Sequence, residues 1–331
     1  MKKLFLNLML LFTLFSFAQN EQLAQYYYEK GDFEKAKLSY EELLENVPQN
    51  TQYFLRVIDC YQQLQQYDSA EKALQNRIDK YHQGNIYVEL GYNYQIQKKE
   101  SKAKEYYEQA IDKIRKNPNE VFAVSSAFEK KVLLDYALQA YDLGTQMLPT
   151  FSFNYQKGLL YGQLGKTDRM IEMFLDEAES HPENSVVIQS QFMRFMTDAS
   201  DFSFSDALRK ALIVRVQKSQ DLFWNHYLSW FYLQGKEFGK AFVQEKAIYK
   251  RAPESLSNII NLAQLAIQEN DQETASEVLG FVLENTKDLQ LLVQAHSYLI
   301  KIQIENAKPK DFPAVALAID GLLKEFEISP F

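Results

Sequence analysis

Residues 84–117 read GNIYVELGYNYQIQKKESKAKEYYEQAIDKIRKN, and variants of this 34-residue stretch recur along most of the chain. Its most constant position is the small residue Ala103, which lies between two runs of good helix formers. At intervals of 33 to 37 residues the same position is held by Ala36, Ala70, Ala103, Ala137, Met170, Ala207, Ala241 and Ala275. Such an interval is typical of a stacked array, in which each unit leaves an apolar face that the next unit covers.

The composition favours helix throughout the chain. Only 11 Gly and 8 Pro occur in 331 residues, which leaves little material for a sheet with many turns. Small residues at the repeated position would let two helix backbones approach closely, and larger side chains there would overpack by ~1–3 kcal/mol. Period and composition together predict an all-α fold built from helix hairpins.

The residues around the repeated alanine carry a resemblance to a known family. In the third copy the large, small and aromatic positions of two helices are held by Tyr87, Leu90, Gly91, Tyr94, Ala103, Tyr107 and Ala110. This pattern resembles the tetratricopeptide repeat, and five other copies support it. The resemblance implies a right-handed α-solenoid of about nine hairpins. It also implies that the recurring aromatics are core residues, namely Tyr27, Tyr61, Tyr94, Phe128, Tyr161 and Tyr232.

The resemblance divides the chain into a leader, an array and a final hairpin. Residues 1–18 form the leader, residues 19–286 the repeats, and residues 287–331 a C-terminal helical hairpin. The expected repeats are residues 17–50, 51–83, 84–117, 118–150, 151–184, 188–221, 222–255 and 256–286. Two departures stand out: Met170 replaces the alanine, and residues 198–205 stretch the sixth copy, where the register is least defined.

The first 18 residues predict export. Lys2 and Lys3 precede an apolar run from Leu4 to Phe17, and small residues at Ser16 and Ala18 have the spacing that a signal peptidase requires. A transmembrane helix needs ~20 apolar residues, so this run fits a cleaved signal better than the alternative, an uncleaved anchor. We expect a mature chain without a transmembrane segment, in the periplasm or on the cell surface of a Gram-negative bacterium.

Charge and cysteine content exclude several classes of protein. The formal charge is −8, or −10 once Lys2 and Lys3 are removed with the signal. A nucleic-acid-binding protein needs basic residues concentrated on one face, and here they are scattered in pairs such as Lys130 and Lys131. The single cysteine, Cys60, cannot form an internal disulfide and is interpreted as a small buried thiol. We therefore expect no nucleic-acid partner.

The sequence offers no motif for catalysis or for a cofactor. It has no Gly-rich phosphate loop, no His-Glu-x-x-His pair, no Gly-x-Ser-x-Gly turn and no Cys-x-x-Cys. The four histidines belong to different copies, and copies that are not neighbours in a solenoid cannot share one site. We expect no catalytic residue, no cofactor and no metal.

Tetratricopeptide arrays bind extended peptides or helices in a concave groove lined by the first helix of each hairpin. The resemblance places nine candidate partner-binding residues in this groove: Gln52, Asp59, Gln62, Asn85, Tyr92, Gln95, Asn119, Ser126 and Tyr155. Further groove positions are Leu55, Val88, Phe122, Glu129, Ser152 and Leu159. Amide and phenol groups can bind a peptide backbone, whereas the alternative interpretation is ordinary solvated helix surface. No position in the set is basic, which disfavours the family's clamp for acidic chaperone tails.

A second candidate surface lies in the seventh copy. Phe223, His226 and Trp230 fall at i, i+3 and i+7 of one helix and so share a face, which the resemblance assigns to the groove. This face could accept an amphipathic helix. Alternatively, the stretched sixth repeat packs over these rings.

At the other end, Leu289–Glu305 and a last helix from Pro313 to about Phe326 form the final hairpin. The last helix presents Ala314, Ala316, Ala318 and Gly321, so either a partner or a second copy covers it, or the chain is a shortened form of a longer solenoid.

These observations predict a non-enzymatic scaffold of the cell envelope that holds a peptide or protein. Two alternatives belong to other classes. One is an α-helical envelope enzyme acting on glycans, which would need converging carboxylates beside stacking aromatics. The other is the sensory ectodomain of a signalling system, which would continue into a membrane helix.

Overall fold

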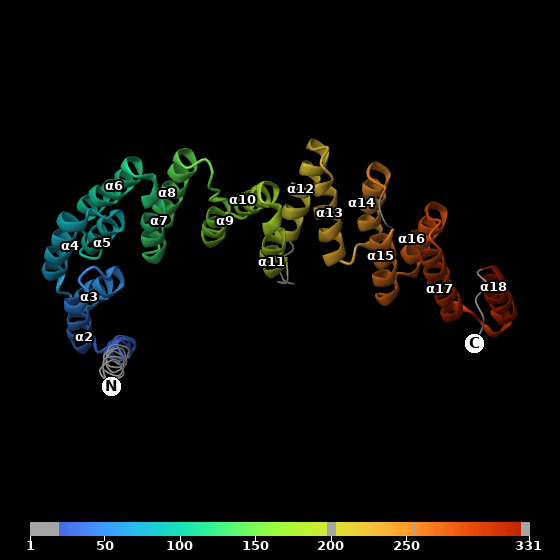
Figure 1. Cartoon of the computed structure of the whole chain (residues 1–331), viewed down its shortest axis with the longest axis horizontal. Helices are drawn as coiled ribbons and strands as arrows, with labels where there is room; N and C mark the ends of the chain where they lie inside the picture. The colour runs from blue at the N-terminus through green and yellow to red at the C-terminus, as the bar shows by residue number, and fades with distance from the viewer. Residues whose placement is uncertain (1–19, 197–202, 254–255, 326–331) are drawn as a thin grey trace, which may run out of the picture. The chain divides into compact units, whose positions relative to one another are not determined.

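A computed structural model describes residues 20–196, 203–253 and 256–325, and this part of the chain is helical without a strand (Figure 1). The expected signal at residues 1–18 lies outside the described residues, as do residues 198–202 of the stretched sixth copy. The helices follow one another as first and second members of successive hairpins, nine of each among the described residues. The predicted all-α fold of about nine hairpins is confirmed.

The first helices are residues 20–29, α3 (Thr51–Gln63), α5 (Gly84–Gln95), α7 (Val121–Lys130), α9 (Asn154–Gln163), α11 (Ser185–Met196), α13 (Leu222–Gln234), α15 (Ser257–Gln268) and α17 (Leu289–Asn306). The second helices are α2 (Phe33–Asn46), α4 (Tyr67–Tyr81), α6 (Glu100–Lys116), α8 (Leu134–Met147), α10 (Thr167–Ser180), α12 (Ser203–Lys218), α14 (Phe238–Arg251), α16 (Gln272–Asn285) and α18 (Phe312–Glu325). Single 3₁₀ turns, η1 (Pro118–Glu120), η2 (Pro182–Asn184) and η3 (Pro309–Asp311), lead into α7, α11 and α18.

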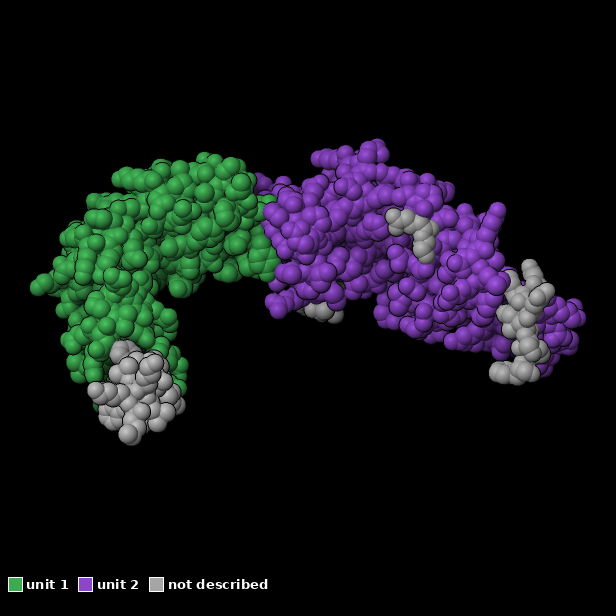
Figure 2. All heavy atoms as spheres, in the orientation of Figure 1, with its two compact units in different colours: residues 1–166 green, residues 167–331 purple. Residues whose placement is uncertain are grey.

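The chain separates into two compact units, residues 1–166 and residues 167–331 (Figure 2). In unit 1 the first helices of neighbouring hairpins lie against each other, as α5 and α7 do, and the second helices α6 and α8 do the same. In unit 2 the pairs α15 with α17 and α14 with α16 repeat this arrangement. Each unit is therefore a stack of hairpins, as the repeat period predicts.

The repeated small residue lies at the helix contact in seven of the eight copies. Ala36, Ala70, Ala103, Ala137, Ala241 and Ala275 are buried, and so is Met170, which shows that the longer side chain is accommodated. In the sixth copy Ala207 is only half-buried and its neighbour Leu208 is fully buried instead. The insertion in that copy has moved the contact by one residue, so the predicted position was wrong there.

A left-handed residue closes the turn inside most hairpins. Five residues before the small residue, φ lies between 55° and 75° at Gly31, Gln65, Lys98, Val132, Gly165, Lys236 and Asn270. In each of these turns the next amide donates to a carbonyl five residues back, as Lys99 N does to Tyr94 O at 3.0 Å. This is the hydrogen bond of a Schellman cap, which ends a helix in a left-handed residue. Only two of the seven residues are glycine, so the sequence shows this turn poorly.

Val132 is the least suitable of these turn residues, because β-branched residues rarely adopt the left-handed backbone conformation. Its side chain is exposed, so a replacement loses little packing. We expect Val132→Asn to raise the free energy of unfolding by about 1 kcal/mol, since Asn tolerates this conformation. Val47→Asn is the matched control, because Val47 is also exposed but has φ −132°. The urea midpoints of the two variants are measured by circular dichroism. An equal change in both would contradict the prediction that the left-handed backbone of Val132 is strained.

The recurring aromatics belong to the core to different degrees. Tyr94, Phe128 and Tyr232 are buried, whereas Tyr27, Tyr61 and Tyr161 are half-buried.

The C-terminal helix α18 packs on α17 but has no buried residue of its own, and Leu317 is 74% exposed. Ala314, Ala316, Ala318 and Gly321 are exposed as well, so an association through this helix stays a prediction. None of the helices that the structure describes is long and apolar enough to cross a membrane.

Candidate functional site

The candidate site is the exposed side of the first helices of unit 1, here called the first-helix face. Of the predicted residues, Gln52 and Asn119 are exposed. Six others are half-buried, namely Asp59, Asn85, Tyr92, Gln95, Ser126 and Tyr155. Gln62 and the neighbouring position Val88 are buried and cannot meet a partner unless the helices move. The face is thus continuous over four hairpins but narrower than the sequence suggests.

The centre of the face is a buried group of charges that joins three hairpins. Lys131, just after α7, places its Nζ 2.9 Å from Glu89 of α5 and 3.1 Å from Asp59 of α3. The same ammonium lies 4.6 Å from the centroid of the Tyr92 ring, which is a cation–π contact. Two predicted residues, Asp59 and Tyr92, therefore share one partner that the sequence analysis did not include.

Burial controls the electrostatics of this group. The side chain of Glu89 is only 5% exposed, and burial raises the pKa of its carboxyl, while Lys131 opposes the rise. For Lys131, burial alone would lower the pKa, but the nearby carboxylates, Glu89 foremost, outweigh it and the pKa is raised. The Lys131 ammonium therefore stays protonated, and it is the shared counter-ion of the Glu89 and Asp59 carboxylates.

Second-helix tyrosines fix two polar positions of the face. The Tyr107 hydroxyl donates to Gln95 Oε1 at 2.5 Å, and the Tyr141 hydroxyl donates to Glu129 Oε1 at 2.6 Å. In both hairpins donor and acceptor are 12 residues apart, so the repeat reproduces the contact. Gln95 and Glu129 are held in place, which reduces the entropy lost when a partner binds.

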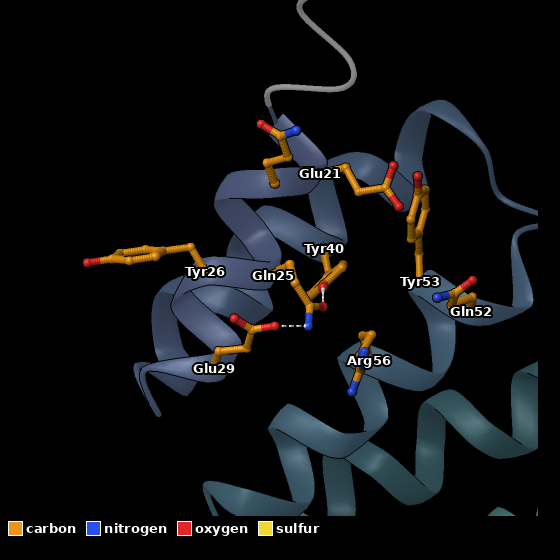
Figure 3. A pocket seen from close by; sticks show the side chains of 9 residues that line it. Glu21, Gln25, Tyr26, Glu29, Tyr40, Gln52, Tyr53 and Arg56 are labelled. Atoms are coloured by element: carbon orange, nitrogen blue, oxygen red, sulfur yellow. Dashed lines mark hydrogen bonds between the residues drawn. The ribbon is translucent and has the colours of Figure 1, made fainter.

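A pocket of about 550 Å³ opens at the N-terminal end of the face (Figure 3). The first helix supplies Glu21, Gln25 and Glu29 to it, and α3 supplies Gln52 and Arg56. Gln25 accepts from the Tyr40 hydroxyl at 2.8 Å and donates to Glu29 at 2.7 Å. The Arg56 guanidinium lies 4.3 Å from the Tyr28 ring centroid. The pocket can hydrogen-bond a partner, and its two carboxylates outnumber its one cation.

The face becomes apolar on the fourth and fifth hairpins. Phe122 of α7 and Phe151, just before α9, are 47% and 50% exposed, and their rings meet edge to face at 5.6 Å. Phe153 beneath them is buried and lies 5.6 Å from Phe122. Leu159 of α9, in the same hairpin as Phe151, is 38% exposed. Phe122, Phe151 and Leu159 are called the apolar patch below.

The second predicted surface, on α13 in unit 2, is partly core. Phe223 contacts the rings of Trp224 and Tyr227, and Trp230 contacts Tyr227, so three aromatics follow one side of the helix. Phe223 and Trp230 are half-buried, and the hydroxyl of Tyr227 donates to Ser185 O at 3.2 Å.

His226 is exposed on α13 and lines a small pocket of about 80 Å³ with α14 and α15. A role for Phe223, His226 and Trp230 in binding a partner stays a prediction.

Groups that could carry chemistry are dispersed. Among the described residues no three of His, Cys, Asp and Glu come together as metal ligands. Cys60 is buried, and burial raises the pKa of its thiol to about 12, so it is a poor nucleophile at neutral pH.

A family model describes three segments of the chain. The model of the tetratricopeptide repeat matches residues 20–50, 84–112 and 151–176. These three segments are tetratricopeptide repeats. The first segment contains the first-helix residues of the N-terminal pocket, such as Glu21 and Gln25. The second contains Glu89 and Tyr92, and the third begins at Phe151 of the apolar patch.

Solved structures of other proteins resemble parts of this one. MamA is 19% identical, with 51% of this chain and 93% of that chain covered at a TM-score of 0.28. YrrB, described as having an unusual peptide-binding site, is 16% identical over 51% and 89% of the two chains at 0.26. The C-terminal part of a repeat protein from Cytophaga hutchinsonii is 14% identical over 82% and 98% at 0.30. No curated protein matches the sequence. At these scores the likeness carries no inference about a partner.

Proposed function

We propose that this tetratricopeptide protein is a non-catalytic scaffold of the bacterial cell envelope, which binds an extended segment of a peptide or protein along the first-helix face of unit 1. The observation that carries the proposal is the face itself. Consecutive first helices present half-buried polar side chains whose positions are fixed from below, by Lys131, Tyr107 and Tyr141. Fixed side chains lose little entropy on binding, which favours recognition of a flexible segment.

Location in the envelope is part of the proposal and is supported by the sequence of residues 1–18. A basic start, an apolar run and small residues at Ser16 and Ala18 match the pattern of an export signal. The acidic net charge of the chain argues against the cytosolic chaperone-tail role of the family. The periplasm or the cell surface of a Gram-negative bacterium is the compartment that we propose.

Site-specific crosslinking in living cells tests the function. A benzophenone amino acid at position 92 should give discrete crosslinked products, because Tyr92 lies at the centre of the face. The same amino acid at position 38 is the control, since Leu38 is exposed on the second helix α2, away from the first-helix face. Equal crosslinking from both positions, or none from position 92, would contradict binding at this face.

The location has its own test. We expect the protein recovered from the envelope fraction to begin just after Ala18 when its N-terminus is sequenced. Recovery of an intact N-terminus from the cytoplasm would overturn the proposed compartment without affecting the proposed binding face.

A further inference from the structure

The proposed function does not specify the chemistry of the bound segment. The residues that line the first-helix face of unit 1 indicate which side chains such a segment carries. We propose that the first-helix face takes an extended segment that is basic at one end and carries a large apolar side chain at the other. The basic end lies over Asp59 and Tyr92, and the apolar side chain lies on the patch of Phe122, Phe151 and Leu159. This inference rests on the proposed function and specifies its partner.

The apolar end follows from exposure that the fold does not require. Phe122 and Phe151 leave about half of each ring in water although the buried Phe153 ring lies directly beneath them. When exposed apolar residues cluster on a protein surface and are bordered by polar residues, they mark a contact site. Asn119, one turn before Phe122, provides such a polar border and is exposed. A phenyl or branched aliphatic side chain would cover the patch.

The basic end follows from the charges of the face. Together with those of the N-terminal pocket, its charged residues are the acids Glu21, Glu29, Asp59, Glu89 and Glu129 and the bases Arg56 and Lys131. Both bases are already engaged: Lys131 is shared by two carboxylates, and Arg56 stacks on Tyr28. Five acids against two bases leave an excess of negative charge. A Lys or Arg side chain is complementary to it, while an acidic segment would be repelled.

Tyr92 adds a second reason for a cation. Its ring is only half-buried and already holds the Lys131 ammonium on one side at 4.6 Å. An aromatic face favours a positive group electrostatically, so a partner's guanidinium could stack on the exposed part of the ring. The side chain of Asp59 is 26% exposed and supplies the carboxylate beside it.

The stacking of the hairpins also predicts the spacing of the two features. Packed helices lie about 10 Å apart and an extended chain advances about 3.3 Å per residue, so one hairpin corresponds to about three residues of partner. Asp59 and Tyr92 belong to the second and third hairpins, and the patch belongs to the fourth and fifth. The basic and apolar residues should therefore be about three to nine positions apart.

Phage display with random dodecapeptides on the immobilised full chain tests the inference. We expect enriched peptides to share a Lys or Arg and a Phe, Leu or Ile at this spacing. The strongest peptide, synthesised with a fluorophore, should bind at least tenfold more weakly to Phe122→Ser/Phe151→Ser. It should also bind several-fold more weakly to Asp59→Asn, with a smaller dependence on salt.

Matched variants separate these effects from loss of folding. Leu38→Ser removes an exposed apolar side chain from α2, and Asp142→Asn removes a carboxylate that pairs with Lys157 at 3.3 Å outside the face. Both should bind the peptide like the unaltered chain, and thermal unfolding should confirm that every variant is folded. Enrichment without the paired features, or equal losses in test and control variants, would overturn this inference and leave the proposed function standing. No enrichment of any peptide would overturn both.

Discussion

Replacing Lys131 by methionine should lower the free energy of unfolding of unit 1 by about 3–5 kcal/mol. Methionine nearly matches the length of the lysine stem but leaves the buried carboxylate of Glu89 without a counter-charge. It also removes the contact that joins the fourth hairpin to the second, where Nζ lies 3.1 Å from Asp59. A urea titration followed by circular dichroism measures the loss.

The adjacent residue supplies the control. Lys130 is exposed at the end of α7, and no ion pair of its side chain lies within 4 Å among the described residues. Lys130→Met makes the same chemical change one position away and should stay within about 0.5 kcal/mol of the unaltered chain. Similar losses in the two variants would show that the change in net charge lowers the stability, and that the contacts of Lys131 with Glu89 and Asp59 do not contribute.

The pH dependence of the free energy of unfolding tests whether Glu89 causes the loss of stability in Lys131→Met. Its pKa is raised in the folded state, so its favourable contribution is complete below the ordinary Glu pKa and is lost as pH rises through the folded value. Asp59, Lys130 and Lys131 are the other charged groups that act on it. In Lys131→Met the loss of stability as pH rises above the ordinary Glu pKa should grow, because the opposing ammonium is gone. Adding Glu89→Gln should remove most of this slope, and a slope that persists would exclude Glu89 as its source.

The sequence predicted the parts of the fold that depend on local contacts. Ala103 marks a crossing of two helices that are neighbours in the chain, so its period shows directly in the sequence. The sixth copy failed because residues 198–205 interrupt the period, and the structure buries Leu208 in place of Ala207. Left-handed turns at Lys98 and Val132 were missed because neither residue is typical of that conformation.

The candidate site was harder to predict because it depends on contacts between hairpins. Lys131 is 72 residues from Asp59, and only the stacking of three hairpins brings them together. One signal was available: Asp59 and Glu89 put acids on successive first helices, and such pairs require a cation nearby when they are buried. Gln62 was expected in the groove because family positions do not show how deep a side chain lies, and it is only 7% exposed.

Gly91→Ala should cost about 3 kcal/mol, at the upper end of the range for overpacking, although alanine is the better helix former. A Cβ at this position of α5 would lie 2.4 Å from Cε1 and 2.6 Å from Cδ1 of the Tyr107 ring, and 3.0 Å from the carbonyl oxygen of Ala103. The ring cannot simply turn away, because its hydroxyl is bonded to Gln95 and the ring is in contact with Phe128. The two helices must therefore separate.

Gly280→Ala is the matched control, since Gly280 also lies inside a helix, α16, and a Cβ there meets no atom within 4 Å. This variant should gain up to about 1 kcal/mol from helix propensity alone. The opposite signs make the comparison decisive, because a general effect of alanine on helices would move both variants in the same direction. Gly91→Ala should also lower the affinity of the first-helix face for a bound segment, because moving Tyr107 breaks its hydrogen bond to Gln95. A variant with unchanged stability would mean that α5 and α6 do not cross as closely as the small residues require.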